Sequence, residues 1–193
     1  MLNADSNSSG SDVQEKKIIK SRINLKAIPV IAFLIALELV LTRFLSINTP
    51  IIRIGFGFLP VSLCALIYGP LWSAVAYAIG DVIGALLFPS GAFFPGFTLT
   101  AFLTGLTFGL FLYRKKDLTH KLTWLNVLPA SLIVCFVLNL GLDTLWLSML
   151  MGDGFWGLMP ARIPKAFIMC AVQVLLIPFI WNRLAPVIKK IIQ

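Results

Sequence analysis

Long apolar stretches alternate along the chain with short polar or Gly/Pro-rich segments. After a polar start at residues 1–26, the apolar stretches are 27–45, 54–68, 71–88, 93–113, 124–151 and 158–181. Most approach the roughly 20 apolar residues with which an α-helix crosses a bilayer. Gly69-Pro70 divides the second stretch from the third, because proline ends a preceding helix. The pattern predicts an all-α membrane protein with six transmembrane helices within residues 27–182, followed by a basic tail at 183–193.

The positions of the lysines and arginines decide between six spans and five. Short cytoplasmic loops are enriched in these residues. With six spans, most basic residues fall on one side: Lys16, Lys17, Lys20, Arg22, Lys26, Arg114, Lys115, Lys116, Lys121, Arg183, Lys189 and Lys190. The opposite side keeps only Arg43, Arg53, Arg162 and Lys165. Five spans would move the loop at 114–121 outside and remove this asymmetry, so we predict six helices with both termini in the cytoplasm.

Composition agrees with a membrane protein. Of 193 residues, 59% are hydrophobic and 12% charged, against about 25% charged in soluble domains. The formal net charge of +8 could suggest a nucleic-acid partner, but its sidedness explains it as a topology signal. We therefore expect membrane lipid and no nucleic acid around this chain.

Motifs for catalysis are missing. The sequence has no G-x-x-x-x-G-K-[ST], no G-x-S-x-G and no H-E-x-x-H, the patterns of P-loop nucleotide sites, hydrolase nucleophiles and zinc proteases. Its one histidine, His120, falls in the basic cytoplasmic loop, and no D-x-x-D pair is present. We predict no enzyme, no catalytic residue, no metal ligand and no cofactor.

Three acids interrupt apolar stretches: Glu38, Asp81 and Asp143. A carboxylate in the bilayer centre costs about 2.5–3.5 kcal/mol on insertion scales, so it normally faces the bundle interior with a partner. Asn139 lies four residues before Asp143 and Trp146 three after it, which places all three on one helical face. These side chains are candidates for a binding site.

The outer connections supply further candidates. Arg162 and Lys165 lie three apart at the start of the last helix, and residues 88–97 hold four Phe, two Pro and two Gly without a charge. An aromatic loop with such corners suits a lid over a flat ligand. Together the segments predict an outward site for an anionic aromatic ligand. Its outer candidates are Arg162, Lys165, Arg53, Asn48, Phe94 and Phe97.

Each candidate also has a structural interpretation. The outer cations could snorkel to lipid headgroups, and the Phe-rich loop could belong to an interfacial aromatic belt. Asp81 could be a hydrogen-bond partner between helices. Glu38 could pair with Arg43.

Ala32 and Ala36 form a small-x-x-x-small pattern, which lets another helix approach closely. In a six-helix chain of this length, the pattern resembles the S components of energy-coupling factor (ECF) vitamin transporters. Residues 80–105, 141–148 and 158–169 resemble the folate-specific S components, the FolT family. The resemblance implies a cell-membrane subunit that binds folate from outside. It also implies docking on a transmembrane coupling subunit that carries two cytoplasmic ATPases.

The same resemblance implies roles for the candidate residues. Arg162 and Lys165, with Arg53 next, would hold the two carboxylates of the glutamate tail, because arginine binds carboxylates bidentately. The pterin ring presents two parallel donors, so either Asp143 or Asp81 would read it. Trp146 would stack on the ring. The remaining candidates are the amides of Asn139 and Asn48, the lid residues Phe94 and Phe97, and the docking residues Ala32 and Ala36.

Other functions stay open on the sequence alone. An S component for riboflavin, thiamine or pantothenate is the first alternative, although a neutral vitamin would not need several outer cations. A membrane-embedded enzyme acting on lipids is a second, and a purely structural membrane subunit is a third.

Overall fold

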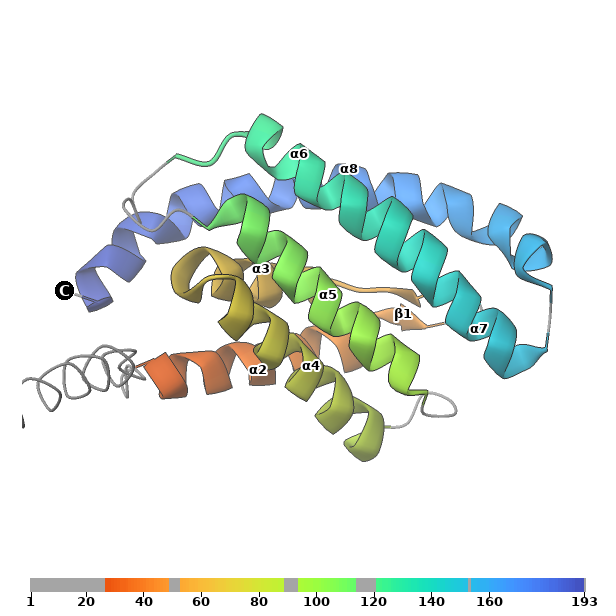
Figure 1. Ribbon diagram of the computed structural model, residues 1–193. Coiled ribbons are helices and arrows are strands. Elements are labelled where there is room, and N and C mark those ends of the chain that lie inside the picture. The colour runs from red at the N-terminus through yellow and green to blue at the C-terminus, as the bar shows by residue number, and fades with distance from the viewer. Residues whose placement is uncertain (1–26, 49–52, 89–93, 114–120, 153, 193) are drawn as a thin grey trace, which may run out of the picture. The chain divides into compact units, whose positions relative to one another are not determined.

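The computed structural model in Figure 1 describes residues 27–48, 53–88, 94–113, 121–152 and 154–192. The chain divides into two units, Met1–Val30 and Ile31–Gln193. In the first unit only residues 27–30 are described, so the packing below concerns the second. The helices are α2 (Ala27–Arg43), α3 (Phe58–Tyr68), α4 (Pro70–Leu87), α5 (Pro95–Leu112), α6 (Trp124–Leu132), the π-helix η1 (Ile133–Leu142), α7 (Asp143–Met151) and α8 (Phe155–Ile192). The predicted tail at 1–26 lies outside the described residues.

The predicted apolar stretches correspond to helices. The run from α6 through α7 occupies Trp124–Met151, the bounds that the hydropathy pattern predicts. Four helical segments of the described chain are long and apolar enough to cross a membrane: Pro70–Leu87, Pro95–Leu112, Trp124–Met151 and Phe155–Pro186. Helix α2 has 17 residues and α3 has 11, so the count of six spans and the side of the termini stay predictions.

Two segments differ from the sequence prediction. Helix α8 begins at Phe155 and continues to Ile192, beyond the predicted helix at 158–181 and through most of the predicted tail at 183–193. Hydropathy marks where a helix leaves the membrane rather than where its backbone hydrogen bonds stop. The connection before α3 contains a short antiparallel ribbon of β1 (Ile47–Asn48) and β2 (Arg53–Ile54), which hydropathy did not indicate.

Small residues fix how α3, α4 and α5 meet. Gly69 has φ +90° between α3 and α4, a conformation that glycine adopts without strain, and Pro70 then begins α4. A Cβ at Gly105 would lie 2.5 Å from the Ser73 carbonyl oxygen, and one at Gly109 would overlap Pro70. The Ser73 hydroxyl donates to the Gly105 carbonyl at 2.7 Å. The Gly-x-x-x-Gly spacing of α5 therefore permits close backbone contact with α4.

The α6–η1–α7 run is helical throughout, but its central part is π-helical rather than α-helical. Pro129 lies inside α6, where it lacks the N–H of a normal α-helical bond. The following ten residues, Ile133–Leu142, are π-helical. Such wide turns are rare and occur often at functional sites. The π-helix ends directly before Asp143, one of the candidate residues.

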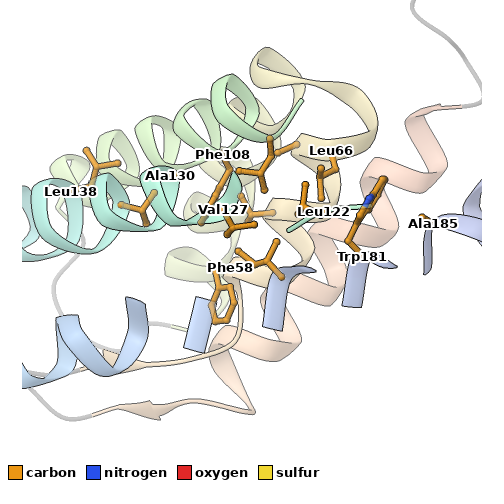
Figure 2. Packing of buried hydrophobic residues seen from close by; sticks show 14 residues of the cluster. Phe58, Leu66, Phe108, Leu122, Val127, Ala130, Leu138, Trp181 and Ala185 are labelled. Carbon is orange, nitrogen blue, oxygen red and sulfur yellow. The ribbon is translucent and has the colours of Figure 1, made fainter. Parts of the chain in front are cut away.

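Apolar side chains fill one part of the bundle. Figure 2 shows side chains of α3, α5, α6 and α8 that point toward one another, among them Phe58, Phe108, Val127 and Trp181. On α5 this cluster takes Phe108 and Leu112, in the last turns of the helix. The first turns of α5, which carry Thr98 and Thr100, contribute no buried side chain to this cluster.

Candidate functional site

A group of interacting polar side chains lies around the first turns of α5. Thr98 and Thr100 lie there, and the neighbouring elements add charged and aromatic groups. The residues joined by hydrogen bonds, ring contacts or electrostatic interaction are Asp81, Phe94, Phe97, Thr98, Thr100, Asp143, Trp146, Arg162 and Lys165. We call this group the polar cluster.

Arg162 is the most unusual member of the polar cluster. It lies on α8 with 6% of its surface exposed. Its guanidinium interacts electrostatically with Asp143, yet Nε and NH1 are buried without a hydrogen-bond acceptor among the described residues. An unsatisfied buried donor costs about 1–3 kcal/mol, and more when it is charged. The arrangement therefore suits a ligand that brings acceptor atoms to these two nitrogens.

Asp143 connects three helices in the polar cluster. It begins α7 and is partly buried. Its carboxylate interacts electrostatically with Arg162, Lys165 and Asp81, and it also interacts with the side chain of Thr100. The sequence places these residues far apart, and the fold brings two acids and two bases into one neighbourhood in which Arg162 is buried and the other three are partly buried.

The second acid has a clear structural partner. The Thr98 hydroxyl donates to Asp81 Oδ2 at 2.8 Å, across the α4–α5 contact. This bond agrees with the interpretation of Asp81 as a partner between helices. Because a carboxylate has several lone pairs, the bond leaves acceptor capacity that a ligand could still use.

Three members of the polar cluster are aromatic. The rings of Phe94 and Trp146 lie 5.6 Å apart at 40°, and those of Phe94 and Phe97 lie 6.2 Å apart at 77°. A Cβ at Gly96 would lie 2.5 Å from the Trp146 ring, so this ring rests on the start of α5. The predicted lid residues are thus in contact with the predicted stacking residue. The central part of the predicted lid, residues 89–93, lies outside the described residues.

The other candidates are placed less fully. Asn139 is partly buried in η1, four residues before Asp143. Asn48 and Arg53 stand opposite each other in the register of the β1–β2 ribbon. Their participation in a site stays a prediction.

Glu38 and Arg43, which the sequence analysis considered as an ion pair, both lie on α2. Glu38 is 4% exposed, and a Cβ at Gly80 would lie 2.5 Å from its Oε2. Arg43 donates to the Phe88 carbonyl at 3.0 Å. A cation there complements the carbonyl end of α4. Whether Glu38 pairs with Arg43 stays a prediction.

The predicted docking residues, Ala32 and Ala36, lie on the exposed face of α2. Both are exposed, whereas Ile31, Leu34 and Glu38 on the same helix are buried. The small-x-x-x-small pattern is therefore available to a helix from outside the chain.

Sequence analysis missed two residues of α5: Thr98, which donates to Asp81, and Thr100, which interacts with Asp143. Hydroxyls are common in membrane helices, so two threonines in an apolar run carry little signal. A metal site was not expected, and the described residues contain no group of three or more His, Cys, Asp or Glu that could hold one.

The helices and the polar cluster define a class: a helical membrane protein with a buried charged site, built to bind a ligand. A family model described as "ECF-type riboflavin transporter, S component" matches residues 22–186. A protein named folate transporter FolT from Clostridium novyi is 44% identical over 151 residues, which cover 78% of this chain and 85% of that protein. FolT of Leuconostoc mesenteroides is 36% identical over 167 residues, covering 84% of this chain and 88% of that one.

A solved structure adds the fold. A crystal structure of FolT bound with folic acid has a TM-score of 0.76 and 37% sequence identity, and the match covers 83% of this chain and 95% of that chain. The chain belongs to the S components of ECF-type transporters, in the group of the folate transporters FolT. It is the membrane subunit that binds the substrate of such a transporter, and it is not an enzyme.

Proposed function

We propose that this chain binds folate at the outer face of the cell membrane and delivers it inward together with a coupling subunit and two cytoplasmic ATPases. Relatives named FolT and the folic-acid complex of one FolT support folate as the substrate. Within this chain, two observations support it: the buried Arg162 nitrogens without an acceptor among the described residues, and the adjoining rings of Phe94 and Trp146.

The polar cluster fits the pterin ring better than the glutamate tail. Arg162 and Asp143 interact electrostatically, so we assign them to neighbouring groups of the ligand rather than to its opposite ends. A pterin edge carries an amino group and a ring N–H beside carbonyl and ring-nitrogen acceptors. Asp143 accepts from the former, Arg162 donates to the latter, and Trp146 offers a face for stacking.

Charge supports the same assignment. Asp143 lies with Arg162, Lys165 and Asp81, and the formal charges of these two acids and two bases cancel. A neutral pterin suits such a group, whereas a tail with two carboxylates would meet like charge from both acids. We therefore assign Arg162 to the ring, in place of the tail role that the resemblance implied. The tail then extends toward the β1–β2 ribbon, where Asn48 and Arg53 are its candidates.

Coupling is assigned to α2. Ala32 and Ala36 are exposed on this helix, and small residues permit close helix contact within a membrane. We assign them to the contact with the coupling subunit. ATP hydrolysis is assigned to the partner ATPases.

The test is ligand binding by the purified chain in detergent, measured by titration calorimetry with folic acid, pteroic acid and riboflavin. Folic acid and pteroic acid, which lacks the glutamate, should both bind, and riboflavin should not. Saturable binding of riboflavin without folic acid would overturn the proposal. Riboflavin is the second candidate, because the matching family model is named for it.

A further inference from the structure

The hydroxyl of Thr100 links two helices at the polar cluster. Thr100 is 3% exposed in the first turns of α5. Its Oγ1 accepts a hydrogen bond from Trp146 Nε1 at 3.1 Å. Oγ1 donates to the Gly96 carbonyl at 3.2 Å, and the Thr100 side chain interacts with the Asp143 carboxylate. One hydroxyl therefore contacts a stacking residue and a carboxylate at once.

The chemistry of a hydroxyl gives these contacts a direction. It has one proton to donate and two lone pairs that accept. The indole N–H is a donor only, so it must use a lone pair of Thr100. The proton of Thr100 is then directed to an acceptor, the Gly96 carbonyl. Trp146 is held at the same time, because its bond does not depend on where the proton points.

Neighbouring threonines of α5 make the same kind of bond within the helix that Thr100 makes to Gly96. Thr104 Oγ1 donates to the Thr100 carbonyl at 2.8 Å, and Thr107 Oγ1 donates to the Leu103 carbonyl at 2.8 Å. Both bonds stay within α5, four residues back, as is usual for hydroxyls in membrane helices. The Thr100 contacts to Trp146 and Asp143 cross to another helix.

We propose that Thr100 is a positioning residue for the ring of the substrate. It holds the plane of Trp146 through the bond from Nε1, so that the stacking ring is set before the ligand arrives. The inference rests on the proposed function and adds a residue that would act through its neighbours. Without the hydroxyl, the indole N–H of Trp146 would lose its acceptor in a buried site, and the ring would reorient toward another one.

Three variants test the role. Thr100→Val keeps the branched shape and removes the hydroxyl, and Thr100→Ser keeps the hydroxyl. Thr104→Val makes the same change one turn along α5 and serves as the matched control. Dissociation constants for folic acid and pteroic acid are measured by calorimetry, and the tryptophan emission spectrum is recorded for each variant and for Thr100→Val combined with Trp146→Phe.

Thr100→Val should raise both dissociation constants by about the same factor, roughly tenfold for a lost buried hydrogen bond. Thr100→Ser should restore most of the affinity, and Thr104→Val should stay within twofold of the unaltered chain. The emission shift caused by Thr100→Val should vanish in the Trp146→Phe background. If Thr100→Val cannot be purified, Trp146→Phe cuts the same bond from its other end while keeping an aromatic face, and should weaken pteroic acid as well.

Several results would overturn the inference. Normal binding by Thr100→Val is one, and an equal loss in Thr104→Val is another, since it would indicate helix packing. A loss for folic acid without a loss for pteroic acid would place the effect at the tail. Normal pteroic-acid binding by Trp146→Phe would also contradict it. If the unaltered chain does not bind folic acid, the proposed function itself fails.

Discussion

The guanidinium of Arg162 and the carboxylate of Asp143 interact between α8 and α7. Nε and NH1 of Arg162 are nevertheless buried without a protein acceptor in the part of the chain that the structure describes. A buried guanidinium with unused donors can recognise a ligand that brings acceptor atoms. The first two predictions concern this pair.

Arg162→Ala should weaken folic acid and pteroic acid by similar factors, roughly 10- to 150-fold for the loss of a charged hydrogen-bond partner. The reason is that Arg162 donates to the ring that both ligands share. Arg162→Lys should not restore binding, because an ammonium does not reproduce the planar fork. Calorimetry measures both. Arg183→Ala is the control, since Arg183 is an exposed cation on the same helix. A loss for folic acid alone would return Arg162 to the glutamate tail.

Asp143→Asn should weaken pteroic acid roughly tenfold or more, because an amide replaces one acceptor with a donor that faces the donors of the ring. Asp81→Asn should have the smaller effect, since Asp81 already accepts from Thr98. Titration of the two variants with pteroic acid compares them directly. Normal binding by Asp143→Asn together with lost binding by a folded Asp81→Asn would show that Asp81 reads the ring.

Ala32→Trp or Ala36→Trp should abolish ATP-driven folate uptake by the assembled transporter while the isolated chain still binds folic acid. The added ring keeps another helix from approaching α2, and both positions lie far from the polar cluster in sequence. Phe33→Trp is the control, because Phe33 is 65% exposed on the same helix and already bulky. Uptake at the normal rate in both alanine variants would move the contact elsewhere.

Gly109→Ala should destabilise the chain by about 1–3 kcal/mol or more, the usual cost of overpacking. The new methyl group would overlap Pro70 of α4, and backbone cannot move aside as a flexible side chain can. Gly157→Ala is the control, since a Cβ at Gly157 would meet nothing within 4 Å. Thermal unfolding in detergent should show a lower midpoint for Gly109→Ala and an unchanged or slightly higher one for Gly157→Ala. Equal midpoints would mean that α4 and α5 do not approach this closely.

The sequence by itself determined the helical segments that hydropathy defines. The run at 124–151 is helical throughout, and the break at Gly69-Pro70 falls where proline and glycine indicate it. Apolar length and chain breakers act locally, so neighbouring residues carry enough information for both. The sequence also identified Asp143, Arg162 and Trp146 as unusual, because charge and aromatic rings in apolar helices require a reason.

Only the tertiary structure decided which of these residues meet. Arg162 lies with Asp143 because α8 packs beside the α6–η1–α7 run, and Thr100 reaches Trp146 and Asp143 across to another helix. Hydropathy cannot predict such pairings, because each depends on how one helix is rotated relative to another. That rotation is set by close contacts such as Gly105 on Ser73 and by the π-helix before Asp143. Gly105 and Gly109 can be read from the sequence, but the backbone that packs against them belongs to α4, and the sequence does not indicate that contact.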